Sequence, residues 1–379
     1  MKLRALFATA CAGLLVAPMA FAEVSAKVGL SGDVETNTTW QYFTTEKGAG
    51  SDDLNSNAWS NDGRTHLKLT GRVDSDSGWF AAAQGDAMIA TGGTTGVDDA
   101  WVQFGTSSFA TKIGRYGLEE LLSKGQDTYI AEAPLRGAGR YQGDYFRGRF
   151  GDAIGNIGFD FTFSETSKMQ IGVIVGGKDV SSVLLSTDST GTAVQSTATF
   201  GANVYGIRPV FIFNSGAFTV KVGGEYGMTS AKDEKISSGT TWVDNDYEKN
   251  QMGGAVDLSM TAGTMSFGVA GAYGQTTGQW VTGEDVADLT QMSVFGWFKM
   301  PVGEADTLGL GVGYFSNDTK DVVTNDSVES YISYAHQLPV EGLKMTFAGS
   351  YAMASADPEK GSSQDSSAYG VRMRMNYDF

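Results

Sequence analysis

The sequence predicts an all-β fold, a 16-stranded antiparallel transmembrane β-barrel. Three observations predict it. The chain has about sixteen runs of alternating apolar and polar residues, the connections between them alternate between short and long, and the mean hydropathy is -0.16. Successive side chains of a strand point to opposite faces, so each run gives its strand one apolar face. Past the first residues, no apolar stretch reaches the roughly 20 residues of a helical membrane span. A near-neutral hydropathy then fits a membrane protein whose strands alternate.

The first residues have the pattern of a secretory signal peptide. Lys2 and Arg4 form a short basic start, residues 5–18 are mostly apolar and small, and Ala20-Phe21-Ala22 fits a cleavage site. We therefore expect residues 1–22 to be removed from the mature protein.

The remaining residues, 23–379, are expected to form one barrel domain, because no Pro- or Ser-rich linker divides them. The chain has 51 Gly and 6 Pro, a balance that favours many strands and turns over a disordered segment.

Cys11, the one cysteine, lies in the signal segment, and apolar sequence continues past it, which disfavours a lipid anchor. The mature chain then has no thiol for a disulfide or a metal. The net charge of -16 disfavours nucleic acid as a partner.

The alternating runs follow the chain at regular spacing. Strands are expected at 24–40, 62–73, 79–88, 98–105, 109–116, 155–164, 168–177, 198–213, 217–230, 247–260, 264–275, 288–300, 307–316, 327–338, 343–355 and 366–379. Longer polar connections are expected at 41–61, 89–97, 117–154, 178–197, 231–246, 276–287, 317–326 and 356–365. Short turns separate the other strands. An even strand count with short turns at one end and long loops at the other is typical of bacterial membrane barrels.

The last expected strand shows the alternation most clearly. Tyr369, Val371, Met373, Met375, Tyr377 and Phe379 share one parity. Arg372 and Arg374 lie on the other. A soluble sandwich could alternate too, but the signal peptide, strand number and loop asymmetry favour the barrel, whose closure leaves no unpaired edge in lipid. A chain ending in such a strand resembles the outer-membrane barrels of Gram-negative bacteria. The resemblance implies that location, with lipid and lipopolysaccharide around the barrel and the last strand paired to the first.

A second resemblance is carried by residues 99–117, Asp-Ala-Trp-Val-Gln-Phe-Gly-Thr-Ser-Ser-Phe-Ala-Thr-Lys-Ile-Gly-Arg-Tyr-Gly. This segment resembles the hairpin of the fourth and fifth strands in the trimeric general porins. In that family the third loop follows and folds into the barrel to narrow the pore. The resemblance implies a homotrimer, an inward-folded constriction loop at 117–154, and a water-filled channel for passive diffusion of small hydrophilic solutes and ions. The family's acidic Pro-Glu-Phe-type loop tip is not recognisable here.

Basic residues gather on the polar parity of three strands that closure would make neighbours. These candidate pore-lining bases are Lys27, Arg64, Lys68, Arg72, Arg372 and Arg374. Acids of the loop could face them across the lumen, and opposed rows of charge create a transverse field that selects ions. The candidate constriction-loop residues are Glu119, Glu120, Asp127, Glu132, Arg136 and Arg140. The alternative is that the wall charges only solvate the lumen and that the loop arginines pin the loop to the wall.

No catalytic residue, metal site or cofactor is expected. The mature chain has two histidines, His66 and His336, and neither has the sequence context of a nucleophile-activating base. His66 lies among bases on a polar face with no carboxylate beside it in the sequence, and His336 shares its parity with apolar residues near a short turn. Oxygen ligands within 317–326 could hold divalent cations that bridge lipopolysaccharide, although solvated loop acids are the favoured interpretation.

Two other functions stay open at this point. A substrate-selective porin, for carbohydrates or other organic solutes, could use tyrosines near the loop as stacking faces; these are Tyr116, Tyr129, Tyr141 and Tyr145. A structural or adhesin barrel could instead act through its acidic loops. Single-channel conductance with and without sugars distinguishes the three.

Overall fold

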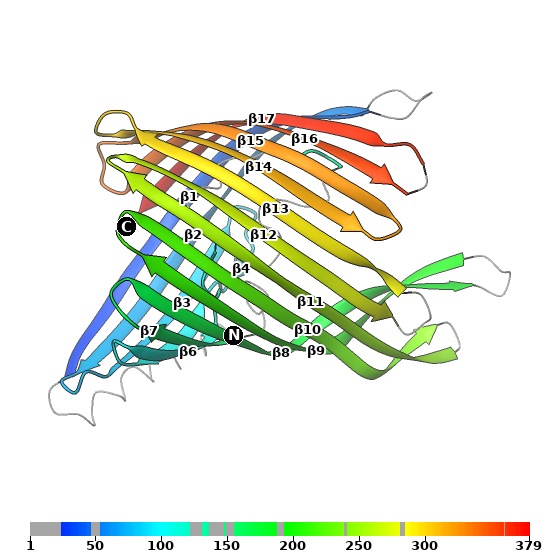
Figure 1. Cartoon of the computed structure of the whole chain (residues 1–379), viewed down its shortest axis with the longest axis horizontal. Coiled ribbons are helices and arrows are strands. Elements are labelled where there is room, and N and C mark those ends of the chain that lie inside the picture. The colour runs from blue at the N-terminus through cyan, green and yellow to red at the C-terminus, as the bar shows by residue number, and fades with distance from the viewer. Residues whose placement is uncertain are drawn as a thin grey trace.

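In the computed structural model of the chain, tilted antiparallel strands wind around a barrel (Figure 1). The structure describes residues 24–46, 54–121, 131–135, 148, 155–187, 193–238, 241–280, 285–359 and 361–379. The expected signal peptide lies outside them. Within them, no helix is long and apolar enough to cross a membrane.

Seventeen strand segments are present in the described residues. They are β1 (Val24–Thr45), β2 (Leu54–Ser75), β3 (Phe80–Ala90), β4 (Thr95–Gly96), β5 (Ala100–Gly105), β6 (Phe109–Arg115), β7 (Asn156–Thr162), β8 (Ser167–Thr187), β9 (Ala193–Asn214), β10 (Phe218–Ser238), β11 (Thr241–Ala262), β12 (Met265–Trp280), β13 (Asp285–Pro301), β14 (Asp306–Thr319), β15 (Val323–Gln337), β16 (Leu343–Pro358) and β17 (Gln364–Asp378).

A β-bulge interrupts one of the strands, so the seventeen segments correspond to sixteen strands of the barrel. Both β4 and β5 pair with the same edge of β3, so they are two parts of one strand. From Gly85 to Met88 the chain of β3 advances three residues, while the partner advances four, from Gly96 to Ala100. One extra residue in the partner is the mark of a bulge, which bends a strand and redirects its side chains. The predicted 16-stranded antiparallel barrel is therefore confirmed.

The barrel closes between its first and last strands. β1 pairs with β17 from Asp33, opposite Asp378, to Thr45, opposite Ser366. Phe379 extends this pairing, because its backbone N–H and C=O each bond Gly32 at 3.0 Å. In the described part of the chain, residues 24–31 of β1 pair only with β2. This end of β1 therefore extends past the end of β17, toward the lower left of Figure 1.

Several strands are longer than expected. β2 begins at Leu54 rather than near 62, and β8 to β11 continue through most of the loops predicted at 178–197 and 231–246. A transmembrane strand needs only about 9–11 residues, so these strands of 21 or 22 residues are longer than the bilayer requires. Outside lipid a strand still needs a hydrogen-bonded neighbour but no apolar face. The alternation fades there while the pairing continues.

The two faces of the wall differ as the parity predicts. On β17, Tyr369, Val371 and Met373 are exposed outward, whereas Ser366, Ala368 and Gly370 are buried on the inner face. An aromatic group formed by Trp40, Trp59 and Tyr369 lies outside, with ring centroids 5.7 and 6.4 Å apart, as in the aromatic girdles of membrane barrels. The inner face is the surface on which a functional site can be built.

Deletion of Phe379 should reduce assembly of the barrel in the outer membrane and leave secretion intact. The deletion removes two backbone hydrogen bonds to Gly32 at the closing seam. Assembly can be measured as the fraction of chain that migrates as a folded, heat-modifiable band. Phe379→Tyr, which keeps the backbone and the ring, is the matched control. Normal assembly of the deleted chain would contradict the closing role.

Candidate functional site

The predicted bases lie on adjacent strands of the inner wall. Lys27 belongs to β1, Arg64, Lys68 and Arg72 to β2, and Arg372 and Arg374 to β17. In the register, Lys27 is opposite Arg72, and both are exposed near the short-turn end. Arg372, opposite Thr39, lies farther toward the long-loop end. The bases are thus spread along the wall rather than gathered at one height, and their pore-lining role remains a prediction.

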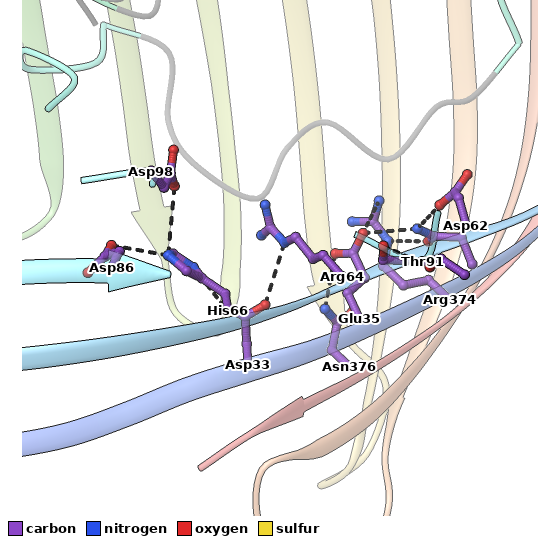
Figure 2. A network of polar contacts seen from close by, with 12 residues as sticks. Asp33, Glu35, Asp62, Arg64, His66, Asp86, Thr91, Asp98, Arg374 and Asn376 are labelled. Atoms are coloured by element: carbon purple, nitrogen blue, oxygen red, sulfur yellow. Dashed lines mark hydrogen bonds and ion pairs between the residues drawn. The ribbon is translucent and has the colours of Figure 1, made fainter. Parts of the chain in front are cut away.

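Acidic residues of the same wall pair with several of these bases. Arg374 Nη2 lies 3.4 Å from Glu35 Oε1, and Arg374 Nε donates to Asn37 Oδ1 at 2.8 Å (Figure 2). Arg64 Nε lies 3.6 Å from Asp33 Oδ2. The inner wall therefore carries both signs of charge. The parity of β1 already contained this signal, since Asp33 and Glu35 alternate with apolar and small residues.

Arg72 is held at the mouth of the barrel. Its Nη2 donates to Asp74 Oδ1 at 2.7 Å, and its guanidinium lies 4.1 Å from the centre of the Phe80 ring. Both partners fix the direction of the side chain. Lys68 lies farther into the barrel, opposite Ser31 on one side and Asp86 on the other.

The connection that follows β6 turns into the barrel at once. Tyr116 is 1% exposed, its hydroxyl donates to the Lys112 carbonyl at 3.0 Å, and the Lys112 ammonium lies 4.3 Å from the centre of its ring. Asn156 Nδ2 donates to the Tyr116 carbonyl. The suggestion that Tyr116 offers a stacking face to a sugar is therefore wrong, because both faces of the residue are covered.

Apolar residues next in the loop pack against the inner wall of β8 to β10. Leu118 and Leu121 are 2% and 0% exposed. Leu118 fills the space above Gly172, and Leu121 lies over Gly223, where an added Cβ would be 3.1 Å from its Cδ1. Glycine at these positions of the wall lets the loop approach closely. Leu121 also joins a buried cluster of inward-facing aromatic side chains that includes Phe295, Trp297 and Tyr331.

Ionic contacts hold the same part of the loop. Lys221 Nζ on β10 lies 2.7 Å from Glu119 Oε1 and 2.9 Å from the Glu120 carbonyl. Arg208 on β9 donates to the Glu119 carbonyl at 3.2 Å and pairs with Glu225 Oε2 at 3.1 Å. The Arg208 and Glu225 side chains are fully buried. Sequence reasoning did not find this pair, because a lumen face accepts both signs of charge without a recognisable spacing.

A second described part of the loop contacts the opposite side of the barrel. The Ala131 N–H donates to Ser350 Oγ at 2.9 Å, and the Leu135 N–H donates to Ser366 Oγ at 3.0 Å. Ala133 packs against Ala352 and adjacent inner-face residues of β16. The wall of β8 to β10 and the wall of β16 and β17 are far apart in the sheet order. The described residues of the connection therefore lie inside the barrel, on two opposite walls.

The predicted loop residues divide into placed and undescribed ones. Glu119 and Glu120 take part in the anchor on β10, and Glu132 is exposed between the buried Ala131 and Ala133. The other predicted loop residues lie outside the described residues. These are Asp127, Arg136, Arg140, Tyr129, Tyr141 and Tyr145.

The histidines also find carboxylate partners that the sequence does not reveal. His66 contacts Asp33 and Asp86 on the neighbouring strands of the wall. His336, on the outer face, has its Nδ1 2.6 Å from Asp306 Oδ1. The acids at 317–326 are not opposite each other: Asp318 is opposite Thr324, and Asp326 is opposite Ser316, in a ladder that ends in a tight turn.

Glu225→Gln should destabilise the folded barrel by about 3–5 kcal/mol, the range for breaking a buried ion pair from one side. The reason is that the variant removes the carboxylate charge 3.1 Å from the buried Arg208 guanidinium. Lys221→Met is the matched control, because its pair with Glu119 is partly exposed and should be worth about 1 kcal/mol or less. Urea unfolding of the refolded chain measures both. Equal losses of unfolding free energy in the two variants would contradict the inference that the buried ion pair contributes more than the partly exposed one.

Comparison with known proteins agrees with this architecture. A family model described as porin-like glycoporin RafY matches residues 30–379. No curated protein matches the chain by sequence. Among solved structures, OmpT of Vibrio cholerae is 12% identical with a TM-score of 0.56, over 95% of this chain and 99% of that chain. An anion-selective porin from Comamonas acidovorans is 15% identical with a TM-score of 0.52, over 94% and 100%. These likenesses show the barrel fold.

The family match covers nearly the whole barrel, from the first strand to Phe379. The chain therefore belongs to the porin-like glycoporin RafY family, as a channel protein of the Gram-negative outer membrane.

Proposed function

We propose that the chain forms a water-filled channel for passive diffusion of small hydrophilic solutes and ions, narrowed by the connection between β6 and β7. The observation that carries the proposal is the attachment of this connection to two opposite walls, through Lys221 on one side and Ser350 and Ser366 on the other. A sixteen-stranded barrel is wide enough for an aqueous lumen. A connection fixed across it sets the size of the passage.

A sugar-selective channel is the second candidate, because the description of the matched family contains the word glycoporin. A general pore conducts ions and is not blocked by sugars, whereas a selective pore shows saturable block. An adhesin or structural barrel conducts little. The same single-channel recording therefore distinguishes the three.

We also propose a homotrimer surrounded by outer-membrane lipid and lipopolysaccharide. Support comes from a structure of OmpT described as a trimer form, which is 12% identical with a TM-score of 0.55 over 94% of this chain and 100% of that chain. We propose no enzymatic activity. The match to a porin-like family model over residues 30–379 supports this.

Replacing Arg64 and Arg72 by Ser should shift the reversal potential toward cations and raise conductance modestly. The Arg64 side chain is 44% exposed, so its charge acts on water in the lumen. The screening length is about 8 Å at physiological ionic strength, so the shift should be largest at low salt. Lys320→Ser, at an exposed turn between β14 and β15, is the matched control for loss of charge. An unchanged reversal potential at low salt would mean that these arginines do not line the narrow part.

Shortening the loop between Ser123 and Gly137 should increase single-channel conductance and admit larger solutes. The deletion removes the attachment to Ser350 and Ser366 but keeps Leu118 to Leu121. β6 and β7 pair with each other from Phe109 to Gly114 without this part of the loop, so barrel assembly should persist. Heat-modifiable mobility checks the fold. If a folded variant keeps its conductance and size cutoff, another segment sets the constriction.

A further inference from the structure

Three residues from separate segments meet on the inner wall beside β1. His66 is on β2, Asp86 is on β3, and Asp98 lies in the bulge between β4 and β5. The backbone of this bulge is fixed by the Asp86 N–H, which donates to the Asp99 carbonyl at 2.8 Å. The extra residue thus turns the Asp98 carboxylate toward the imidazole of His66 (Figure 2).

The distances between the side-chain atoms fit metal coordination. His66 Nε2 lies 3.1 Å from Asp86 Oδ2 and 3.9 Å from Asp98 Oδ2, and the three ligand atoms lie within 4.8 Å of one another. Ligands bound to tetrahedral zinc at about 2.0–2.2 Å lie about 3.3 Å apart. A small contraction of the cluster would therefore place one nitrogen and two oxygen atoms around an ion.

A further carboxylate orients the imidazole. His66 Nδ1 lies 3.3 Å from Asp33 Oδ1 on β1, on the side of the ring away from Asp86. A proton on Nδ1 shared with Asp33 leaves the lone pair of Nε2 for a metal. Carboxylate–histidine pairs of this kind are the usual support of metal-binding imidazoles. Asp33 is itself held near Arg64, at 3.6 Å.

Burial gives an independent observation that points to a missing partner. His66 and Asp86 are 4% and 2% exposed. Asp86 Oδ2 accepts from Gln84 Nε2 at 3.1 Å as well as contacting His66, but Asp86 Oδ1 has no hydrogen-bond partner in the described part of the chain. A buried carboxylate oxygen without a partner is costly. A cation coordinated by both Asp86 oxygens would satisfy Oδ1, while Oδ2 faces His66. Lys68 is opposite Asp86 in the register, yet no ion pair joins the two within the described residues.

We propose that His66, Asp86 and Asp98 bind one divalent transition-metal cation, with Zn²⁺ as the probe, and that Asp33 is the positioning residue for His66. One imidazole and two carboxylates are a donor set that suits Zn²⁺ and related ions. The ion would add positive charge to the inner wall, so it should lower cation conductance. The site exists on the wall whether or not the channel passes solutes as proposed above.

The test is calorimetric titration of the tag-free, refolded mature chain, residues 23–379, with Zn²⁺. One ion per chain is expected for the intact protein. His66→Ala and Asp98→Asn should abolish binding, and Asp33→Asn should weaken it by about 10–100-fold, the usual effect of losing an orienting partner. His336→Ala is the matched control, because it removes the mature chain's other histidine, which also contacts an aspartate, and should leave Zn²⁺ binding unchanged.

The outcomes distinguish Zn²⁺ binding at this wall site from Zn²⁺ binding elsewhere on the chain. Absence of Zn²⁺ binding to the intact chain, or unchanged binding by folded His66→Ala, would overturn the site. Equal loss in His336→Ala would place binding elsewhere and also overturn it. If His66→Ala does not fold, Asp98→Asn decides, because Asp98 is only partly buried and carries no strand pairing. A chain that binds Zn²⁺ but does not conduct would support the site while contradicting the proposed channel.

Discussion

The rest of the structure depends on the hydrogen bonding of backbone groups in lipid, which offers them no hydrogen-bond partners. In lipid, each N–H and C=O of a spanning strand needs a protein partner, and only a closed sheet supplies one to every strand. Pairing of β1 with β17 closes the sheet and gives its first and last strands their partners. Gly32 and Phe379 exchange backbone hydrogen bonds at the end of this pairing. Closure around sixteen strands then creates a lumen whose inner face must be polar or filled.

The chain uses both solutions on its inner face. Around Phe295, Trp297 and Tyr331 the wall is filled by aromatic side chains, which lie over wall glycines such as Gly268 and Gly311 and pack with Leu121 of the loop. Along β17, β1 and β2 the wall is polar, and carboxylates, amides and guanidinium groups bond one another. Both regions contact the inner loop: the aromatic wall packs against Leu121, and Ser366 of β17 bonds Leu135.

The sequence predicted the parts of the strands that face lipid. Tyr369, Val371 and Met373 alternate because their outward neighbour is hydrocarbon, and β17 was recognised from them. Strand ends were missed where water surrounds the chain: Asn55 to Asn61 belong to β2 but show no apolar parity. The bulge at Asp98 was also missed, because one extra residue in a ladder leaves no periodic signal. The contacts of His66 with Asp33 and Asp86 arise from register, which a single strand's sequence does not contain.

The two attachments of the inner loop have a mechanical consequence. An open cylinder of paired strands is stiff along its hydrogen bonds but easily flattened across its width. Here the described residues of one connection bond β10 through Lys221 and bond β16 and β17 through Ser350 and Ser366, on walls that are not neighbours in the sheet order. The proposed constriction element would therefore also resist flattening of the barrel, and a force that makes the barrel oval would act first on these few side-chain contacts.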